Sequence, residues 1–203
     1  MTNLNANSYS SLLYLVTHPH PNWLEQVTWL IAEGIPWVQI RNKNATSTEL
    51  SRQVESVLEF VERQGLPTTV VLNDNVHVAK SFGIGVHLGQ SDMLPSDARE
   101  ILGPDVPIGW TIHDDVSLIA SQQKHIQYVG VGPLFPTTTK LDTKSQILLE
   151  RLGTVCSESP LPVVAIGGIN ASNIHLIRDV NPWGIAMSSA LMNAKTLRSF
   201  CTL

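Results

Sequence analysis

Eight short apolar runs, each followed by a stretch long enough for a helix, recur along almost the whole chain. The runs predict strands at residues 12–16, 37–41, 69–73, 85–88, 107–111, 128–132, 162–166 and 184–187. Between them, apolar residues recur at helical spacing, clearly in residues 48–63 with Leu50, Val54 and Val57, and less regularly in residues 148–155. Strands that alternate with helices in this way form a parallel sheet of the α/β class.

The number of repeats favours a closed sheet, the (β/α)8 or TIM barrel, over a doubly wound open sheet of similar length. Periodicity alone does not show closure. However, polar residues follow nearly every predicted strand, and the carboxyl ends of barrel strands all meet at one mouth. We therefore expect a single TIM barrel with one shared site. Helix starts are predicted at Thr46 or Ser47 before Glu49, at Ser96, and at Ser172.

The composition limits the class of protein. With 203 residues, 43% of them hydrophobic, and no shift in composition, we expect one domain over residues 1–203 with a short polar N-terminal segment of about ten residues. The formal net charge of -4, without a run of lysine or arginine, argues against nucleic acid as a partner. The sequence shows neither a membrane span nor a signal peptide, and Cys156 and Cys201 lack metal or redox spacing. These features predict a cytoplasmic protein, and a homo-oligomer stays open.

One segment carries the clearest functional signal. Residues 131–140 read VGPLFPTTTK, in which an apolar run gives way to three hydroxyls and an ammonium group, donors that suit an anion. The next predicted strand is followed by Gly167 and Gly168, where bare backbone amides can approach a phosphate. The last predicted strand is followed by Ser188 and Ser189. Three successive strand ends of this kind predict one phosphate-binding cup.

A second group of polar residues follows the earlier strands. Gln39, Arg41 and Lys43 alternate along the chain and so share one side, which predicts a polyphosphate clamp, although a solvated strand end has the same pattern. Asp74 and Asp92 follow the third and fourth strands and together suit Mg2+, although either alone is typical of a helix cap.

Histidines near the strand ends are interpreted more simply. The pair His18 and His20 flanks a proline and predicts a surface turn, and His87 is expected to be a hydrogen-bonded barrel residue.

Taken in order, the segments QxRxK, NDN, HLGQSD, GWTIH, GPLFPTTTK, AIGGIN and SSA resemble the thiamine phosphate synthase family, from about residue 14 to residue 191. The resemblance implies a transferase of thiamine biosynthesis with small phosphorylated substrates. Such an enzyme condenses 4-amino-2-methyl-5-hydroxymethylpyrimidine diphosphate with a thiazole phosphate, uses Mg2+, and releases pyrophosphate and thiamine phosphate.

The resemblance also implies a role for each matching residue. The pyrimidine diphosphate would contact Gln39, Arg41, Lys43, Asn73, Thr111 and Lys140. The thiazole phosphate would contact Thr137, Thr138, Thr139, Gly168, Ser188 and Ser189, and Mg2+ would be held by Asp74 and Asp92. The catalytic residues would be Lys140, Arg41, Lys43 and Thr111, which stabilise the leaving pyrophosphate.

The chain departs from the family pattern at Thr111, where serine is usual, at Thr138, where proline is usual, and at residues 141–146, which lack glycine. Two alternatives to a synthase stay open. One is an isomerase similar to the thiazole tautomerases, with His113 as general acid and base. The other is a paralogue that binds a phosphorylated ligand without turnover. Release of pyrophosphate would distinguish the synthase from both.

Overall fold

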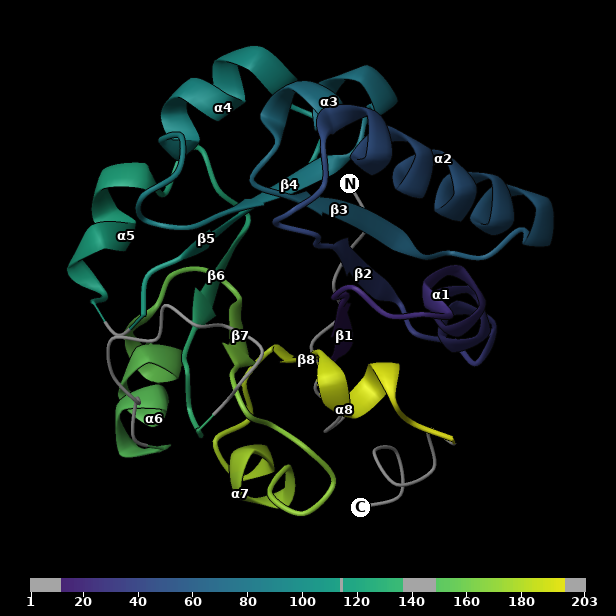
Figure 1. Cartoon of the computed structure of the whole chain (residues 1–203). Coiled ribbons are helices and arrows are strands. Elements are labelled where there is room, and N and C mark those ends of the chain that lie inside the picture. The colour runs from purple at the N-terminus through teal and green to yellow at the C-terminus, as the bar shows by residue number, and fades with distance from the viewer. Residues whose placement is uncertain (1–11, 114, 137–148, 196–203) are drawn as a thin grey trace.

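The computed structural model describes residues 12–113, 115–136 and 149–195, in which eight parallel strands close into a barrel ringed by helices (Figure 1). The strands pair in sequence order, and β8 pairs with β1 to close the sheet. The predicted barrel is therefore confirmed. The strands are β1 (Leu12–Val16), β2 (Trp37–Ile40), β3 (Thr69–Asn73), β4 (Gly85–Leu88), β5 (Ile108–Thr111), β6 (Tyr128–Val131), β7 (Val163–Ile166) and β8 (Gly184–Met187).

The predicted strand limits differ from these by at most one residue at an end. β5 and β7 each begin one residue later than predicted, after Pro107 and Pro162. Proline has no N–H to donate to a ladder, but the carbonyl oxygens of both residues accept, at 3.0 Å, from Val86 and Val129. The two prolines therefore mark the entry to the barrel at its amino end.

The helices are α1 (Trp23–Ala32), α2 (Ser47–Gln64), α3 (Val76–Phe82), α4 (Pro95–Leu102), α5 (Ser117–Gln122), α6 (Leu149–Glu158), α7 (His175–Arg178) and α8 (Ser189–Met192). Helix α2 begins as predicted, because Thr46 and Glu49 form a capping box. Two other predicted starts are wrong. Helix α4 begins at Pro95, whose fixed φ suits the first helical position, so Ser96 lies inside it. Ser172 lies in a turn before α7, where Asn170 accepts from its N–H and hydroxyl.

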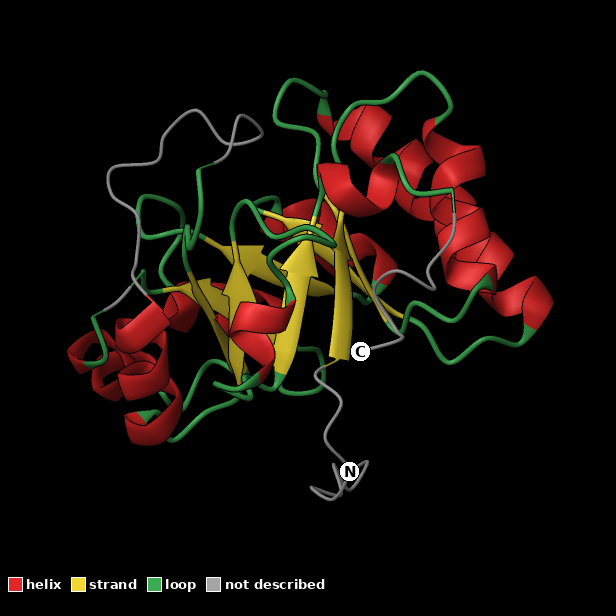
Figure 2. Ribbon diagram, turned by 90° about the horizontal axis from the view of Figure 1, so that it is seen from below, coloured by secondary structure: helices red, strands yellow, loops and turns green. Residues whose placement is uncertain are grey.

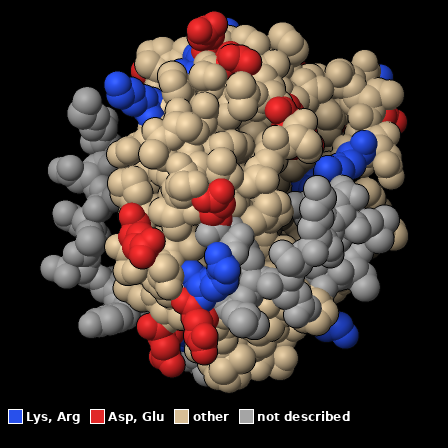
Figure 3. Space-filling view, turned by 90° about the vertical axis from the view of Figure 1, so that its left-hand side faces the viewer, with Lys and Arg blue, Asp and Glu red and all other residues tan. Residues whose placement is uncertain are grey.

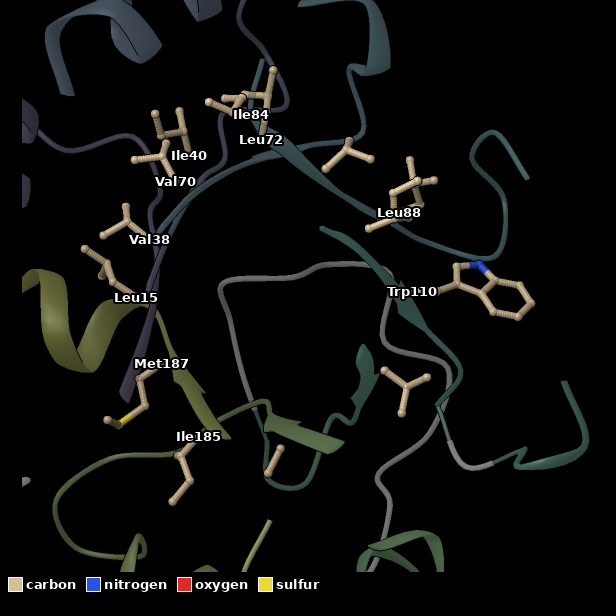
Figure 4. Packing of buried hydrophobic residues seen from close by; sticks show 14 of the residues in the cluster. Leu15, Val38, Ile40, Val70, Leu72, Ile84, Leu88, Trp110, Ile185 and Met187 are labelled. Atoms are coloured by element: carbon tan, nitrogen blue, oxygen red, sulfur yellow. The ribbon is translucent and has the colours of Figure 1, made fainter. Parts of the chain in front are cut away.

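Alternate strand residues face two different environments. Leu15, Val38, Leu72 and Ile185 belong to the apolar layer between the barrel and its helices, where Figure 4 shows them. Tyr14, Val16, Tyr128, Val164 and Ala186 form a separate buried cluster. Since Tyr14 on β1 and Tyr128 on β6 touch although their strands are not neighbours, this cluster fills the inside of the barrel.

The strands run side by side in one direction, so their carboxyl ends lie at one end of the barrel (Figure 2). On the face seen in Figure 3, the described Lys and Arg residues are interspersed with Asp and Glu and form no continuous basic patch. No helix in the described ranges is long and apolar enough to cross a membrane. Cys156 is a free thiol whose pKa is raised by burial to about 11, so it stays protonated at neutral pH.

Candidate active site

A cavity of about 1160 Å³ occupies the mouth of the barrel. Its walls include every residue of the predicted site that the structure describes, namely Gln39, Arg41, Lys43, Asn73, Asp74, Asp92, Thr111, Gly168, Ser188 and Ser189. The remaining predicted site residues, Thr137, Thr138, Thr139 and Lys140, lie outside the described residues. Residues separated by up to 150 positions in the sequence thus share one cavity, as expected when strand ends converge at a barrel mouth.

Asp74 and Asp92 form a pair of interacting carboxyls. Asp74 follows β3 in the left-handed region, with φ of 60°, and its backbone N–H donates to the carbonyl of His87 at 3.0 Å. One carboxylate oxygen of Asp92 accepts from the Gly89 N–H at 2.6 Å. Burial, together with a hydrogen bond to Asp92 and the charge of Asp92, raises the pKa of Asp74 from 3.8 to about 6. Like charges held this close favour a bound cation.

Two cationic residues, Arg41 and Lys43, lie near this carboxyl pair and carry the opposite charge. Strand β2 ends at Ile40, so both follow it in a loop, yet both line the cavity and both lower the pKa of Asp74. The loop is anchored by the fully buried Thr17, whose hydroxyl accepts from the Arg41 N–H at 2.9 Å. No sequence pattern singles out Thr17 as part of the site. A buried threonine next to a strand end is a weak signal by itself.

The loop after β7 packs on the loop after β6. The N–H groups of Leu134 and Phe135 donate to the carbonyls of Ile166 and Gly167 at 3.1 and 3.0 Å. Gly168 has φ of 65°, and a Cβ there would lie 2.5 Å from the Pro136 carbonyl oxygen, so this close approach of two backbones requires glycine. The described residues just before the predicted threonine segment are thereby held against the cavity wall.

His18 contributes a contact at the end of β8 that the sequence did not indicate. His18 and His20 do lie in the loop after β1, but His18 Nδ1 is 3.0 Å from Ser188 Oγ. Burial lowers the pKa of His18, and the nearby His20 and Arg41 lower it further, so a neutral imidazole faces Ser188 near neutral pH. The pairing of β1 with β8 brings these residues together across 170 positions.

Two further histidines line the cavity. His113 has φ of 56° and lies 2.8 Å, at Nδ1, from the Gly132 carbonyl oxygen. Because a carbonyl only accepts, Nδ1 is the donor, and Nε2 is the ring nitrogen left to exchange a proton with a ligand. His87 is the hydrogen-bonded barrel residue that was predicted, in contact with Tyr128 and Thr111.

Comparison with known proteins gives a consistent result. The family model described as thiamine monophosphate synthase matches residues 13–191. Thiamine-phosphate synthase of Azorhizobium caulinodans is 37% identical over 90% of this chain and 87% of its own length. The enzyme of the same name from Vibrio parahaemolyticus is 34% identical over 90% of this chain and 91% of its own. The solved structure of thiamine phosphate pyrophosphorylase from Pyrococcus furiosus is similar with a TM-score of 0.79 and 29% identity, and the similarity covers 95% of this chain and 93% of the other.

Proposed function

The chain belongs to the thiamine monophosphate synthase family, and we propose that it makes thiamine phosphate at the mouth of its barrel. The substrates are 4-amino-2-methyl-5-hydroxymethylpyrimidine diphosphate and a thiazole phosphate, and the second product is pyrophosphate. One observation carries this proposal. Arg41 and Lys43 lie in one cavity with the Asp74 and Asp92 pair, close enough for their charges to change the pKa of Asp74. Cations beside a carboxylate pair suit a metal-bound diphosphate.

The reaction needs the protein to stabilise a leaving group rather than to attack. The bond between the pyrimidine methylene carbon and the diphosphate oxygen breaks, its electron pair leaves with pyrophosphate, and the thiazole nitrogen forms the new bond to carbon. Arg41 and Lys43, with Lys140 beyond the described residues, offset the charge that develops on pyrophosphate. Gln39, Asn73 and Thr111 hold the pyrimidine diphosphate in line with the nucleophile.

The carboxylate pair fits Mg2+. Magnesium prefers one or two carboxylates together with water and substrate phosphates, and Asp74 and Asp92 supply two carboxylates at the cavity wall. Asp74 and Asp92 would hold the ion, and Mg2+ would supply charge neutralisation for the diphosphate when bound.

The thiazole phosphate binds at the ends of β7 and β8. Gly168 lines this part of the cavity, where its backbone N–H would meet an anion, and Ser188 and Ser189 supply hydroxyls on the next strand end. Thr137, Thr138 and Thr139 complete this subsite in the proposal. The two anion subsites therefore use different strand ends of one cavity.

The test is to mix purified protein, both substrates and Mg2+, and to measure pyrophosphate and thiamine phosphate. We expect the two products in equal amounts, and neither when one substrate is omitted. Lys43→Ala should slow the reaction about 10²- to 10³-fold, as is typical of losing one electrostatic contact to a transition state. Lys124→Ala removes an exposed lysine outside the cavity and should leave the rate unchanged.

The experiment also addresses the alternative that uses His113, whose Nε2 lone pair would suit a general base. An isomerase would interconvert thiazole phosphate tautomers without forming pyrophosphate, and a binding protein would do neither. Either outcome would refute the synthase proposal.

A further inference from the structure

A chain of hydrogen-bonded side chains crosses the inside of the barrel. The Gln39 side-chain N–H donates to the Tyr14 hydroxyl at 3.1 Å, and the hydroxyls of Tyr14 and Tyr128 are 2.9 Å apart. The Tyr128 hydroxyl is 3.0 Å from His87 Nδ1, and His87 Nε2 is 2.9 Å from the Thr111 hydroxyl. These hydrogen bonds therefore link five strands, from β2 through β1, β6 and β4 to β5, and the residues at both ends, Gln39 and Thr111, line the cavity.

Both tyrosines in this chain keep their protons. Tyr14 and Tyr128 are each 1% exposed. Burial raises the pKa of Tyr14 to about 12 and raises that of Tyr128 well above 10. Each hydroxyl therefore has one proton to donate at neutral pH, and a buried hydroxyl proton without an acceptor would be costly.

Because each hydroxyl has only one proton to donate, the hydrogen bonds from Gln39 to Thr111 can run in only one direction. An amide nitrogen can donate but not accept, so Tyr14 accepts from Gln39 and donates to Tyr128. The Tyr128 proton then needs an acceptor, so Tyr128 donates to Nδ1 of His87, and a ring that accepts at Nδ1 carries its proton on Nε2, directed at the Thr111 oxygen. In the reverse direction, the Tyr14 proton would point at the amide nitrogen of Gln39.

We propose that Tyr128 and His87 are positioning residues that make the Thr111 hydroxyl a hydrogen-bond donor to the bound ligand. With its oxygen already accepting from His87, Thr111 has its own proton free for the cavity. It therefore recognises an acceptor, either an unprotonated ring nitrogen or a phosphate oxygen. This inference rests on the proposed function for the identity of the ligand, the pyrimidine diphosphate.

Two glycines show that the barrel is built around these side chains. A Cβ on Gly109 of β5 would collide with the Tyr128 ring and hydroxyl. A Cβ on Gly130 of β6 would lie 3.2 Å from His87 Cε1 and 3.5 Å from the Thr111 hydroxyl. Interior glycine weakens a strand, so its presence at both places reflects the close approach of other side chains.

The donor direction of these hydrogen bonds can be measured without any substrate. Long-range proton–nitrogen spectra of protein labelled with 15N-histidine report which ring nitrogen carries the proton, and His87→Gln identifies the His87 signals by their loss. We expect wild-type His87 with its proton on Nε2 and a mixture of both tautomers in Tyr128→Phe. A wild-type proton on Nδ1 would overturn the proposed direction, whether or not the protein is a synthase.

The consequence for the ligand is tested by a double-mutant cycle on binding of the pyrimidine diphosphate. Thr111→Val should weaken binding by about 2- to 10-fold, as for one neutral hydrogen bond, and Tyr128→Phe by no more than that. In Thr111→Val protein, Tyr128→Phe should have no further effect, because both act through one hydroxyl. His87→Gln, which keeps a donor near the Nε2 position, should bind more tightly than His87→Leu.

The control is Thr68→Val, which loses a hydroxyl bond of 3.3 Å to the Ile35 carbonyl, away from the cavity. It should lower stability without changing ligand binding. If Tyr128→Phe weakens binding equally with and without Thr111, the positioning role is refuted. If wild-type protein binds the diphosphate but releases no pyrophosphate, the proposed function fails while the positioning role stands on the cycle and the spectra.

Discussion

Asp74→Asn should make the protein more stable at pH 8 in the absence of Mg2+. The raised pKa of Asp74 means that the folded protein binds this proton more tightly than the unfolded chain does. Its favourable contribution is complete below about pH 3.8 and is lost as the pH rises through about 6, so at pH 8 an ionised Asp74 destabilises the fold. Asparagine removes that charge and also tolerates the left-handed backbone at this position.

The size of the effect follows from the shift. A rise from 3.8 to about 6 corresponds to about 3 kcal/mol for a fully buried group. Because Asp74 is partly exposed to solvent, screening reduces this to about 1–2 kcal/mol. Urea unfolding at intervals from pH 4 to pH 8 would show the gain at pH 8 shrinking to near zero at pH 4. Asp179→Asn, an exposed carboxylate outside the cavity, should show no such gain.

Magnesium should reverse the order of stability. An ion that binds only the folded protein stabilises it, so saturating Mg2+ should raise the free energy of unfolding of wild type and much less that of Asp74→Asn. Two results would refute the proposed role of the Asp74 charge. One is an Asp74→Asn variant that is no more stable than wild type at pH 8, and the other is a gain in the free energy of unfolding that is the same at pH 4 as at pH 8.

Three other outcomes are expected. In steady-state titrations with the other substrate saturating, Arg41→Ala should raise the KM for the pyrimidine diphosphate about 10- to 150-fold. Ser189→Ala should instead raise the KM for the thiazole phosphate, by about 2- to 10-fold. If both substitutions raised the KM for the same substrate, the assignment of two subsites would be wrong. Gly109→Ala should lower the free energy of unfolding by about 1–3 kcal/mol or more, since its Cβ collides with the Tyr128 ring, and an unchanged urea midpoint would contradict that packing. Arg99→Lys should lose about 1–3 kcal/mol of stability, because the guanidinium donates to three backbone carbonyls, while both KM values stay unchanged.

The barrel was predictable from the sequence because its signals are local. A buried parallel strand reads as a continuous apolar run, and Pro107, Pro162 and Gly132 mark where runs begin or end. The capping box at Thr46 is equally local. Ser96 and Ser172 misled because serine caps helices only where nothing stronger sets the start, and Pro95 does so in α4.

Convergence of the predicted site residues was predictable for a similar reason. Each polar residue follows an identifiable strand, and closure of the barrel places all strand ends at one mouth. Contacts across the barrel were not predictable. His18 and Ser188 are 170 positions apart and Tyr14 and Tyr128 are 114 apart, and their meeting depends on stagger and side-chain length rather than on periodicity.

The amino half of the barrel interior is closed by aromatic side chains. The Trp37 ring makes edge contacts with Tyr14, Tyr128 and Trp183 at centroid distances of 5.7, 5.5 and 5.4 Å. Strands of four or five residues leave little height, so a layer of rings this large fills the lower part and leaves the upper part as the cavity. Because the tyrosine hydroxyls are the polar edge of that layer, the group that seals the barrel also determines where the protons above it point. Stability and ligand orientation are therefore coupled through the same two tyrosines.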